Sequence, residues 1–378
     1  MHQSDIISTM QKNIYRLKKI PYGPHFKKSI LVIVSILITL LVCEFISYLL
    51  FKDKNGIFPR YVTDTQYGDF RIRRNMPNAH YWHKSGDGQW EFLINNQGFR
   101  DKREFDYQKP AEVVRVLVIG DSFTIGFEVQ QEDTYAAVTE RYLKQNGVNA
   151  EVINAGMSGN SNAEELIFFE QEGWKYQPDI VVLGYYVNDL DDNIKSDLYH
   201  LIHCELSLNK REYLPAINIS NFLNSFGVYR WLSGHSYFLN LILNAATEFS
   251  KQRLAENNMA IINTEEADEQ GATITNQDYK EMLSIALVKR IYTLTQAYNA
   301  YFILLDIPNR DLKLSFPHQD NCHSGKVADA YIDSAALLKK YQGIIDLYQP
   351  HGLHHWTRFS HLIAGEEIGK IILGFLKR

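Results

Sequence analysis

The segment around Ser122 is the strongest candidate for chemistry in this 378-residue chain. An apolar run, VVRVLVIG (113–120), ends in a Gly-Asp-Ser turn that would lift the Ser122 hydroxyl out of the backbone. Because ligands of an α/β sheet bind at the carboxyl ends of its strands, Ser122 is a candidate nucleophile. The same turn has a structural interpretation, in which Asp121 or Ser122 caps the following helix.

Two later strand ends carry groups that could stabilise the oxyanion of an acyl transfer. A predicted strand at 150–154 is followed by NAGMSGNS, in which Gly159 could offer a backbone N–H at the head of a helix. A predicted strand at 180–185 is followed by Asn188, whose amide could donate to a developing negative charge. Alternatively, Gly159 is a turn residue and Asn188 a helix cap.

A general base could come from the histidine cluster HGLHHWT (351–357), just before a predicted C-terminal helix. Found in this order, the four segments resemble the SGNH (GDSL) hydrolase family. GDSFT resembles its nucleophile turn, NAGMSGNS its glycine segment, YVNDL its asparagine segment and HHWTRFSHLIAGEEI its terminal histidine–helix segment. The resemblance covers about residues 95–200 and 300–375.

The resemblance implies an α/β fold, a three-layer α/β/α sandwich with a central parallel sheet. It also implies serine esterase activity, with Ser122 as the nucleophile. The implied oxyanion hole consists of the Ser122 N–H, the Gly159 N–H and the Asn188 side chain.

The chain departs from the family at the third member of the catalytic triad. The family usually places an Asp two or three residues before its catalytic histidine, but here Gly352 and Leu353 precede His355, and no carboxylate precedes His354. The HWT pattern favours His355 as the base, and the HGLH pattern favours His354. A backbone carbonyl could orient a Ser–His dyad, or Asp346 could reach the site.

A near-continuous apolar run from Ser29 to Phe51 predicts a transmembrane helix. As a helix it would extend roughly 34 Å, enough to cross a bilayer. Basic residues are concentrated before it, which predicts a single-pass protein of the cytoplasmic membrane with its N-terminus inside and its catalytic domain outside, or periplasmic. A cleaved signal peptide and a buried core helix are the alternatives. The run is long for a signal peptide, and no Ala-x-Ala site follows it.

Composition excludes some function classes. A net charge of −5 and a pI near 6.2 argue against a nucleic-acid partner. Cys204 and Cys322 could pair in an oxidising compartment or remain free, and neither lies in a zinc-like cluster. The acidic run after Asn188 suits a helix N-terminus better than a calcium loop. We therefore expect no metal and no cofactor.

The predicted organisation has four parts: a cytoplasmic basic segment (1–28), a signal-anchor helix (29–51), a small β-rich extension (52–110) and a hydrolase-like domain (111–378) with a helical insertion (195–290). We expect core strands at 113–119, 150–154, 180–185, 301–306 and 343–347. Helices are expected at 134–146, from 162, at 277–298, 327–341 and 358–377, and an exposed loop at 263–277. The apolar face of 228–249 could be core, lid, partner surface or membrane contact.

These features predict a membrane-anchored extracytoplasmic serine esterase acting on an acylated small molecule, glycan or lipid of the cell envelope. One alternative is an O-acyltransferase that uses the same acyl-enzyme. The other is a catalytically impaired domain that binds glycan or scaffolds a complex, which the missing Asp would favour.

Overall fold

The computed structural model describes residues 24–53, 56–269, 275–317 and 325–377, with the backbone alone for 261–269. The chain divides into two compact units after Leu50. In the first unit, helix α2 (Pro24–Phe51) contains the predicted apolar run and begins five residues before it. It is long and apolar enough to cross a membrane. The hydroxyls of Ser29 and Thr39 donate to carbonyls one turn back, so they find partners within the helix.

The second unit is built on a five-stranded parallel sheet with the order β12-β11-β7-β5-β6. This confirms the predicted central parallel sheet. The strands are β5 (Val114–Gly120), β6 (Ala150–Asn154), β7 (Ile180–Tyr185), β11 (Tyr301–Asp306) and β12 (Ala330–Asp333).

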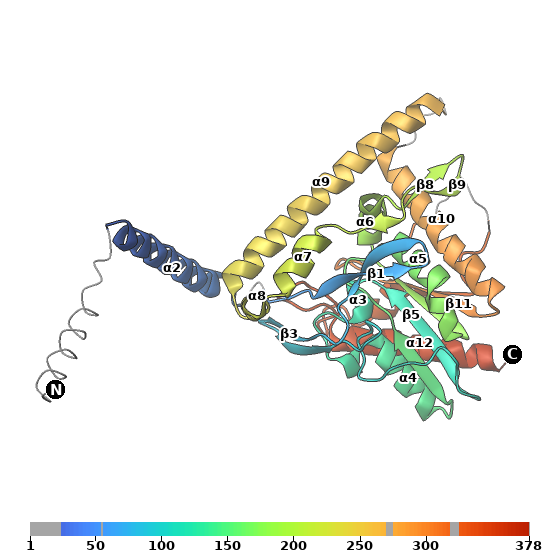
Figure 1. The fold of residues 1–378 in the computed structure, drawn as a ribbon. Helices are drawn as coiled ribbons and strands as arrows, with labels where there is room; N and C mark the ends of the chain where they lie inside the picture. Colours follow the sequence, from blue (N-terminus) through green and yellow to red (C-terminus); the bar gives the residue numbers. More distant parts are fainter. Residues whose placement is uncertain (1–23, 54–55, 270–274, 318–324, 378) are drawn as a thin grey trace, which may run out of the picture. The chain divides into compact units, whose positions relative to one another are not determined.

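Both faces of this sheet are covered, which explains why its strands are apolar without alternation. Along β5, Leu117 and Ile119 point into one core, and Val116 and Val118 into the other. Helices α5 (Asn162–Gln171), α6 (Asn188–Ser196) and α10 (Asn276–Ala297) lie on the first side. Helices α4 (Tyr135–Gln145), α11 (Ser334–Lys339) and α12 (Arg358–Leu376) lie on the second (Figure 1). The three-layer α/β/α architecture is therefore confirmed.

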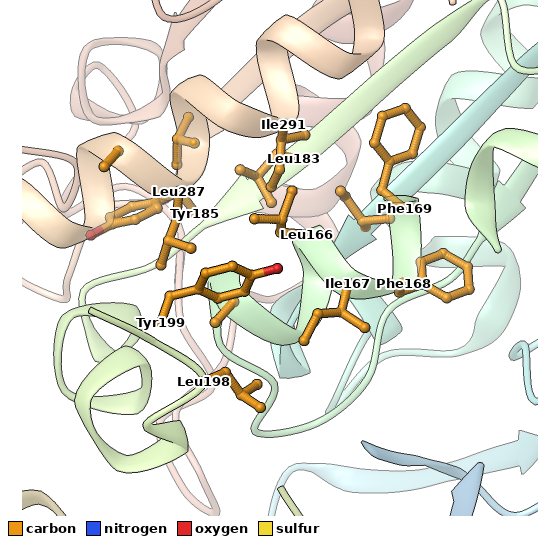
Figure 2. Close-up of a cluster of buried hydrophobic side chains, with 14 of the residues drawn as sticks. Leu166, Ile167, Phe168, Phe169, Leu183, Tyr185, Leu198, Tyr199, Leu287 and Ile291 are labelled. Carbon is orange, nitrogen blue, oxygen red and sulfur yellow. The ribbon is translucent and has the colours of Figure 1, made fainter. Parts of the chain in front are cut away.

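Figure 2 shows the first core, where side chains of α5, such as Leu166, meet Leu183 of β7 and Leu287 of α10. All three are buried, with exposed fractions of 1% or less. The helix that follows the glycine segment is thus fixed between the sheet and α10. Its N-terminus carries a capping box, in which Ser161 and Glu164 bond each other's backbone N–H.

Two antiparallel hairpins precede the parallel sheet. Strands β1 (Val62–Tyr67) and β2 (Phe70–Asn75) pair, and β10 (Glu212–Tyr213) joins β2. Strands β3 (His80–Ser85) and β4 (Gly88–Leu93) form the other hairpin. A third core joins this second hairpin to Ile125 and Phe127, just after the nucleophile turn. Burial lowers the pKa of His83 well below its usual value in this core, so the ring is neutral there.

The region expected to be mostly helical contains three short strands that periodicity did not reveal: β10, described above, β8 (Tyr199–Ile202) and β9 (Glu205–Leu208). Its helices are α7 (Ile217–Asn224), α8 (Gly227–Ser233) and α9 (Tyr237–Glu269). The expected loop at 263–277 is wrong at both ends, because α9 continues to Glu269 and α10 begins at Asn276. Residues 270–274 lie outside the described part.

Two predictions near the C-terminus are also wrong. The helix expected at 327–341 is divided into strand β12 and helix α11, because β-forming Tyr331 and Ile332 pair with β11 before Asp333 caps the helix. No strand forms at 343–347, where Gly343 adopts a left-handed turn with φ +76°. The remaining elements are α3 (Ser122–Ile125) and two 3₁₀ turns, η1 (Gln131–Asp133) and η2 (Gly173–Tyr176).

Of the cysteines, Cys43 is free and Cys204 is disulfide-bonded. Cys322 lies outside the described residues.

Candidate active site

The nucleophile turn is built as the sequence suggests, and it also caps a helix. Gly120 ends β5 with φ +148°, and a Cβ there would collide with the Thr124 hydroxyl, so only glycine fits. Asp121 accepts the Phe123 N–H at 2.9 Å and caps the one-turn helix α3. The capping interpretation and the nucleophile interpretation therefore describe the same turn, because the cap fixes the backbone that presents Ser122.

His355 lies directly over Ser122. Its Nε2 is 2.8 Å from the Ser122 Oγ, within the range for proton transfer from a serine nucleophile to a base. The rings of Phe123 and Phe127 flank the imidazole, with centroids 4.7 and 5.3 Å away. Since His355 is only 8% exposed, these neighbours restrict the ring to one orientation.

A buried carboxylate, Glu128, holds the other side of this histidine. Glu128 Oε2 accepts the backbone N–H of His355 at 2.9 Å and lies 3.3 Å from His355 Nδ1. Glu128 Oε1 accepts the Leu353 N–H at 3.0 Å. Glu128 is completely buried and has φ +62°, a conformation that costs a non-glycine residue about 1–2 kcal/mol. The carboxylate absent before the histidine is thus supplied by another part of the chain.

The segment that carries Glu128 is fixed by Arg100. This buried guanidinium donates to the carbonyls of Ile125 at 3.0 Å, of Gly126 at 2.5 Å and of Val129 at 2.8 Å. Burial lowers the pKa of Arg100 to about 9. The backbone of residues 125–129 is therefore tied to one buried fork of donors.

The glycine segment lies against the nucleophile turn, because the Met157 N–H donates to the Gly120 carbonyl at 2.9 Å. Gly159 adopts φ +74°, and Arg73 Nη2 donates to its carbonyl oxygen at 2.5 Å. Within the described ranges, the N–H groups of Ser122 and Gly159 have no protein acceptor. Both are therefore available to a bound oxyanion.

Asn188 begins α6 and faces the same turn. Its Nδ2 donates to Asp192 Oδ2 at 2.9 Å, which leaves the second hydrogen of the amide for another acceptor. Burial raises the pKa of Asp121, and the hydrogen bond from the Phe123 N–H opposes this rise. The structure thus brings Ser122, His355, Gly159 and Asn188 to the carboxyl-end edge of the sheet.

The other histidine candidate does not reach Ser122. His354 has φ +59°, and its Nδ1 lies 2.9 Å from the Gln349 carbonyl oxygen. In the described part of the chain it makes no contact with Ser122. Asp346 is exposed, and its backbone carbonyl accepts from the Thr357 hydroxyl at 2.8 Å, whereas its carboxylate has no hydrogen-bond partner among the described residues.

Sequence reasoning missed Glu128, although a signal was present. Glu128 is a lone charged residue between Phe127 and Val129, six positions after Ser122. The resemblance directed the search for a carboxylate to the residues just before the histidine. Among the described residues, no group of three His, Cys, Asp or Glu side chains could hold a metal ion.

No family model matches the chain, and no curated protein matches its sequence. Solved structures similar to it include a G-D-S-L family lipolytic protein from Desulfitobacterium hafniense DCB-2 (10% identity, TM-score 0.34, 68% of this chain and 99% of that one). Others are the acetyl-xylooligosaccharide esterase Axe2 from Geobacillus (14%, 0.36, 71% and 95%) and the esterase EstA from Pseudoalteromonas sp. (15%, 0.33, 70% and 100%).

Proposed function

We propose that the chain is a serine esterase of the SGNH type, with Ser122 as nucleophile, His355 as base and Glu128 as the residue that positions His355. Ser122 Oγ attacks the acyl carbonyl carbon and transfers its proton to His355 Nε2. His355 then returns that proton to the leaving alkoxide, which departs as the alcohol. Water, deprotonated by the same nitrogen, releases the acid and regenerates Ser122. The 2.8 Å contact between Ser122 Oγ and His355 Nε2 carries this proposal.

The oxyanion formed at each step would be bound by the Ser122 N–H, the Gly159 N–H and the Asn188 amide. Two of these donors are backbone groups fixed by the Gly120 turn and by the Arg73 contact to Gly159. Donors that are positioned in advance stabilise the transition state more than the substrate, which is the requirement for catalysis.

Glu128 argues against a catalytically impaired scaffold. A domain that only bound glycan would have no need for a buried carboxylate at φ +62° behind the histidine. The three contacts of Glu128 to His355 and Leu353 offset that backbone cost and fix the imidazole toward Ser122. We therefore favour an active enzyme.

We also propose that α2 anchors the chain in the cytoplasmic membrane with the catalytic unit outside. The excess of Lys and Arg before residue 29 supports this orientation. The disulfide at Cys204 suits an oxidising compartment. An acylated envelope glycan or lipid is the substrate class that this location favours.

Hydrolysis of p-nitrophenyl acetate by the full chain in detergent tests the esterase. We expect Ser122→Ala to lower kcat at least ~10³-fold, while Ser207→Ala on β9 leaves it unchanged. A fluorophosphonate probe should label the wild type and not Ser122→Ala. Turnover that persists in Ser122→Ala would refute the assignment. Acyl product found on an added sugar rather than in water would indicate the acyltransferase instead.

A further inference from the structure

An apolar face on α7 and α8 is largely exposed, although the Trp231 ring stacks on the His235 ring with centroids 4.9 Å apart. Its members, which we call the α7–α8 face, come from one segment of 14 residues: Ile219, Phe222, Phe226, Val228, Trp231 and Leu232. Val228 is 72% exposed, Phe222 64% and Trp231 60%. The Phe222 and Phe226 rings lie 5.0 Å apart, so the helices present neighbouring aromatic side chains outward. Clustered exposed apolar side chains of this kind mark interaction sites in soluble domains.

The charge pattern around this face is unusual for a solvated surface. No Asp or Glu occurs between Glu212 and Glu248, although the chain has 44 acidic residues. Arg230, an exposed cation, lies beside Trp231 in α8. Tryptophan beside a basic residue is the composition that enters the interface of an anionic lipid bilayer. Asp64, which accepts from Asn221 of α7, is paired with Arg71.

Few residues of the sequence separate the end of α2 from residues that are bound to the elements of this face. Helix α2 ends at Phe51, and six residues can extend at most about 20 Å, so Ile57 remains within that reach. The residues that follow are bound to the elements of the face. The Phe58 N–H donates to Asn240 of α9 at 3.3 Å, and the Tyr61 hydroxyl donates to the Arg230 carbonyl at 3.0 Å.

We propose that the α7–α8 face binds the lipid surface of the membrane that α2 anchors. This inference rests on the proposed anchoring and goes beyond the esterase chemistry. The apolar side chains enter the headgroup and acyl boundary, and Arg230 lies at the level of anionic headgroups. The catalytic unit then has a second membrane contact, which holds it in one orientation at the membrane rather than on a free tether.

Tryptophan quenching in vesicles tests this contact. The full chain would be reconstituted in vesicles of phosphatidylglycerol and phosphatidylcholine, with the phosphatidylcholine either brominated in its acyl chains or unmodified. We expect bromine to quench the wild type, and Trp231→Phe to remove more than half of that quenching. The matched control is Trp174→Phe, a half-exposed tryptophan of η2 stacked on Tyr298, which should leave the quenching unchanged.

Equal quenching in wild type and Trp231→Phe, or no quenching in either, would overturn the lipid contact. Cross-linking between copies through this face would overturn it in favour of self-association. Extraction of the vesicles with alkaline carbonate separates the two proposals. A chain that stays in the pellet but shows no Trp231-dependent quenching refutes the docking alone, whereas a chain released into the supernatant refutes the anchoring as well. Turnover of p-nitrophenyl acetate should be equal in wild type and Trp231→Phe.

Discussion

Replacing Glu128 by Gln is the most informative perturbation of the site. The side chain keeps its size, but one carboxylate oxygen becomes an NH₂ group. Both oxygens of Glu128 face N–H donors, those of Leu353 and His355, so in either orientation the new amide places hydrogens against a donor. The variant therefore removes the negative charge behind His355 and leaves a buried N–H without an acceptor.

The size of the effect follows from the contacts. A hydrogen bond to a charged group contributes about 1.5–3 kcal/mol, and each 1.36 kcal/mol in the barrier is a tenfold change in rate. If only that bond is lost, kcat should fall between about 10-fold and 10²-fold. If the imidazole also takes the wrong tautomer, the loss approaches the ~10⁴ of the serine-protease aspartate. Because the Nδ1–Oε2 distance of 3.3 Å is long for a charge-assisted bond, we expect a loss near the lower figure, about 10-fold.

The assay is steady-state hydrolysis of p-nitrophenyl acetate by Glu128→Gln, with the thermal midpoint as a check on folding. A positioning role predicts that kcat falls while KM stays nearly constant, since Glu128 touches His355 and not the substrate. Glu128→Asp should recover part of the loss, and Glu132→Gln, an exposed neighbour in η1, should have no effect. A folded Glu128→Gln enzyme with kcat within about threefold of the wild type would refute the role, because that is less than the weakest charged bond.

Three further perturbations test neighbouring parts of the structure. A Cβ at Gly352 (φ +69°) would strike Glu128 Oε1, so Gly352→Ala should lower kcat at least ~10-fold. The control is Gly343→Ala, where φ is +76° but the space around the Cβ is open, and it should leave kcat unchanged. Equal kcat values in the two variants would contradict this. Asn188→Ala should lower kcat about 10²–10³-fold if its amide binds the oxyanion, and an unchanged kcat would exclude that role. Burial lowers the pKa of His361 in the folded protein to about 3. Below pH 6.5 the unfolded chain therefore binds a proton that the folded protein does not, and the free energy of unfolding decreases as the pH falls. His361→Gln keeps a hydrogen-bond acceptor but does not titrate. In urea unfolding, the decrease in the free energy of unfolding between neutral pH and pH 5 should therefore be smaller than in wild type by about 2 kcal/mol, and an equal decrease would contradict this.

The parts of the site that were predictable from the sequence are those fixed by local geometry. Gly120 ends a buried strand, Gly159 and Asn188 come within five residues of the ends of the next two, and parallel strands bring their carboxyl ends to one edge. The apolar runs therefore located both the sheet and the residues at its edge. Short elements were less predictable, because the burial pattern of β12 becomes clear only once β11 is its neighbour.

The contact between Glu128 and His355 could not be deduced in this way. The two residues are 227 positions apart, and their approach depends on the left-handed backbone of Glu128 and on the long segment between them. The sequence could not decide between His354 and His355 as the base for the same reason. Adjacent residues point in different directions, and only the folded loop shows that His354 faces the Gln349 carbonyl and His355 faces Ser122.

In the proposed mechanism, Glu128 also explains how Ser122 and His355 keep their relative positions. The segment from Ser122 to Val129 holds the nucleophile at one end and the carboxylate near the other, and the Arg100 guanidinium fixes it by bonds to the carbonyls on either side of Glu128. When the carboxylate precedes the histidine in sequence, it moves with the histidine. Here it moves with the nucleophile, so any shift of the C-terminal loop breaks the His355–Glu128 and His355–Ser122 contacts together. Loop displacement should therefore inactivate the enzyme in one step, without an intermediate in which a correctly oriented histidine is merely distant from Ser122.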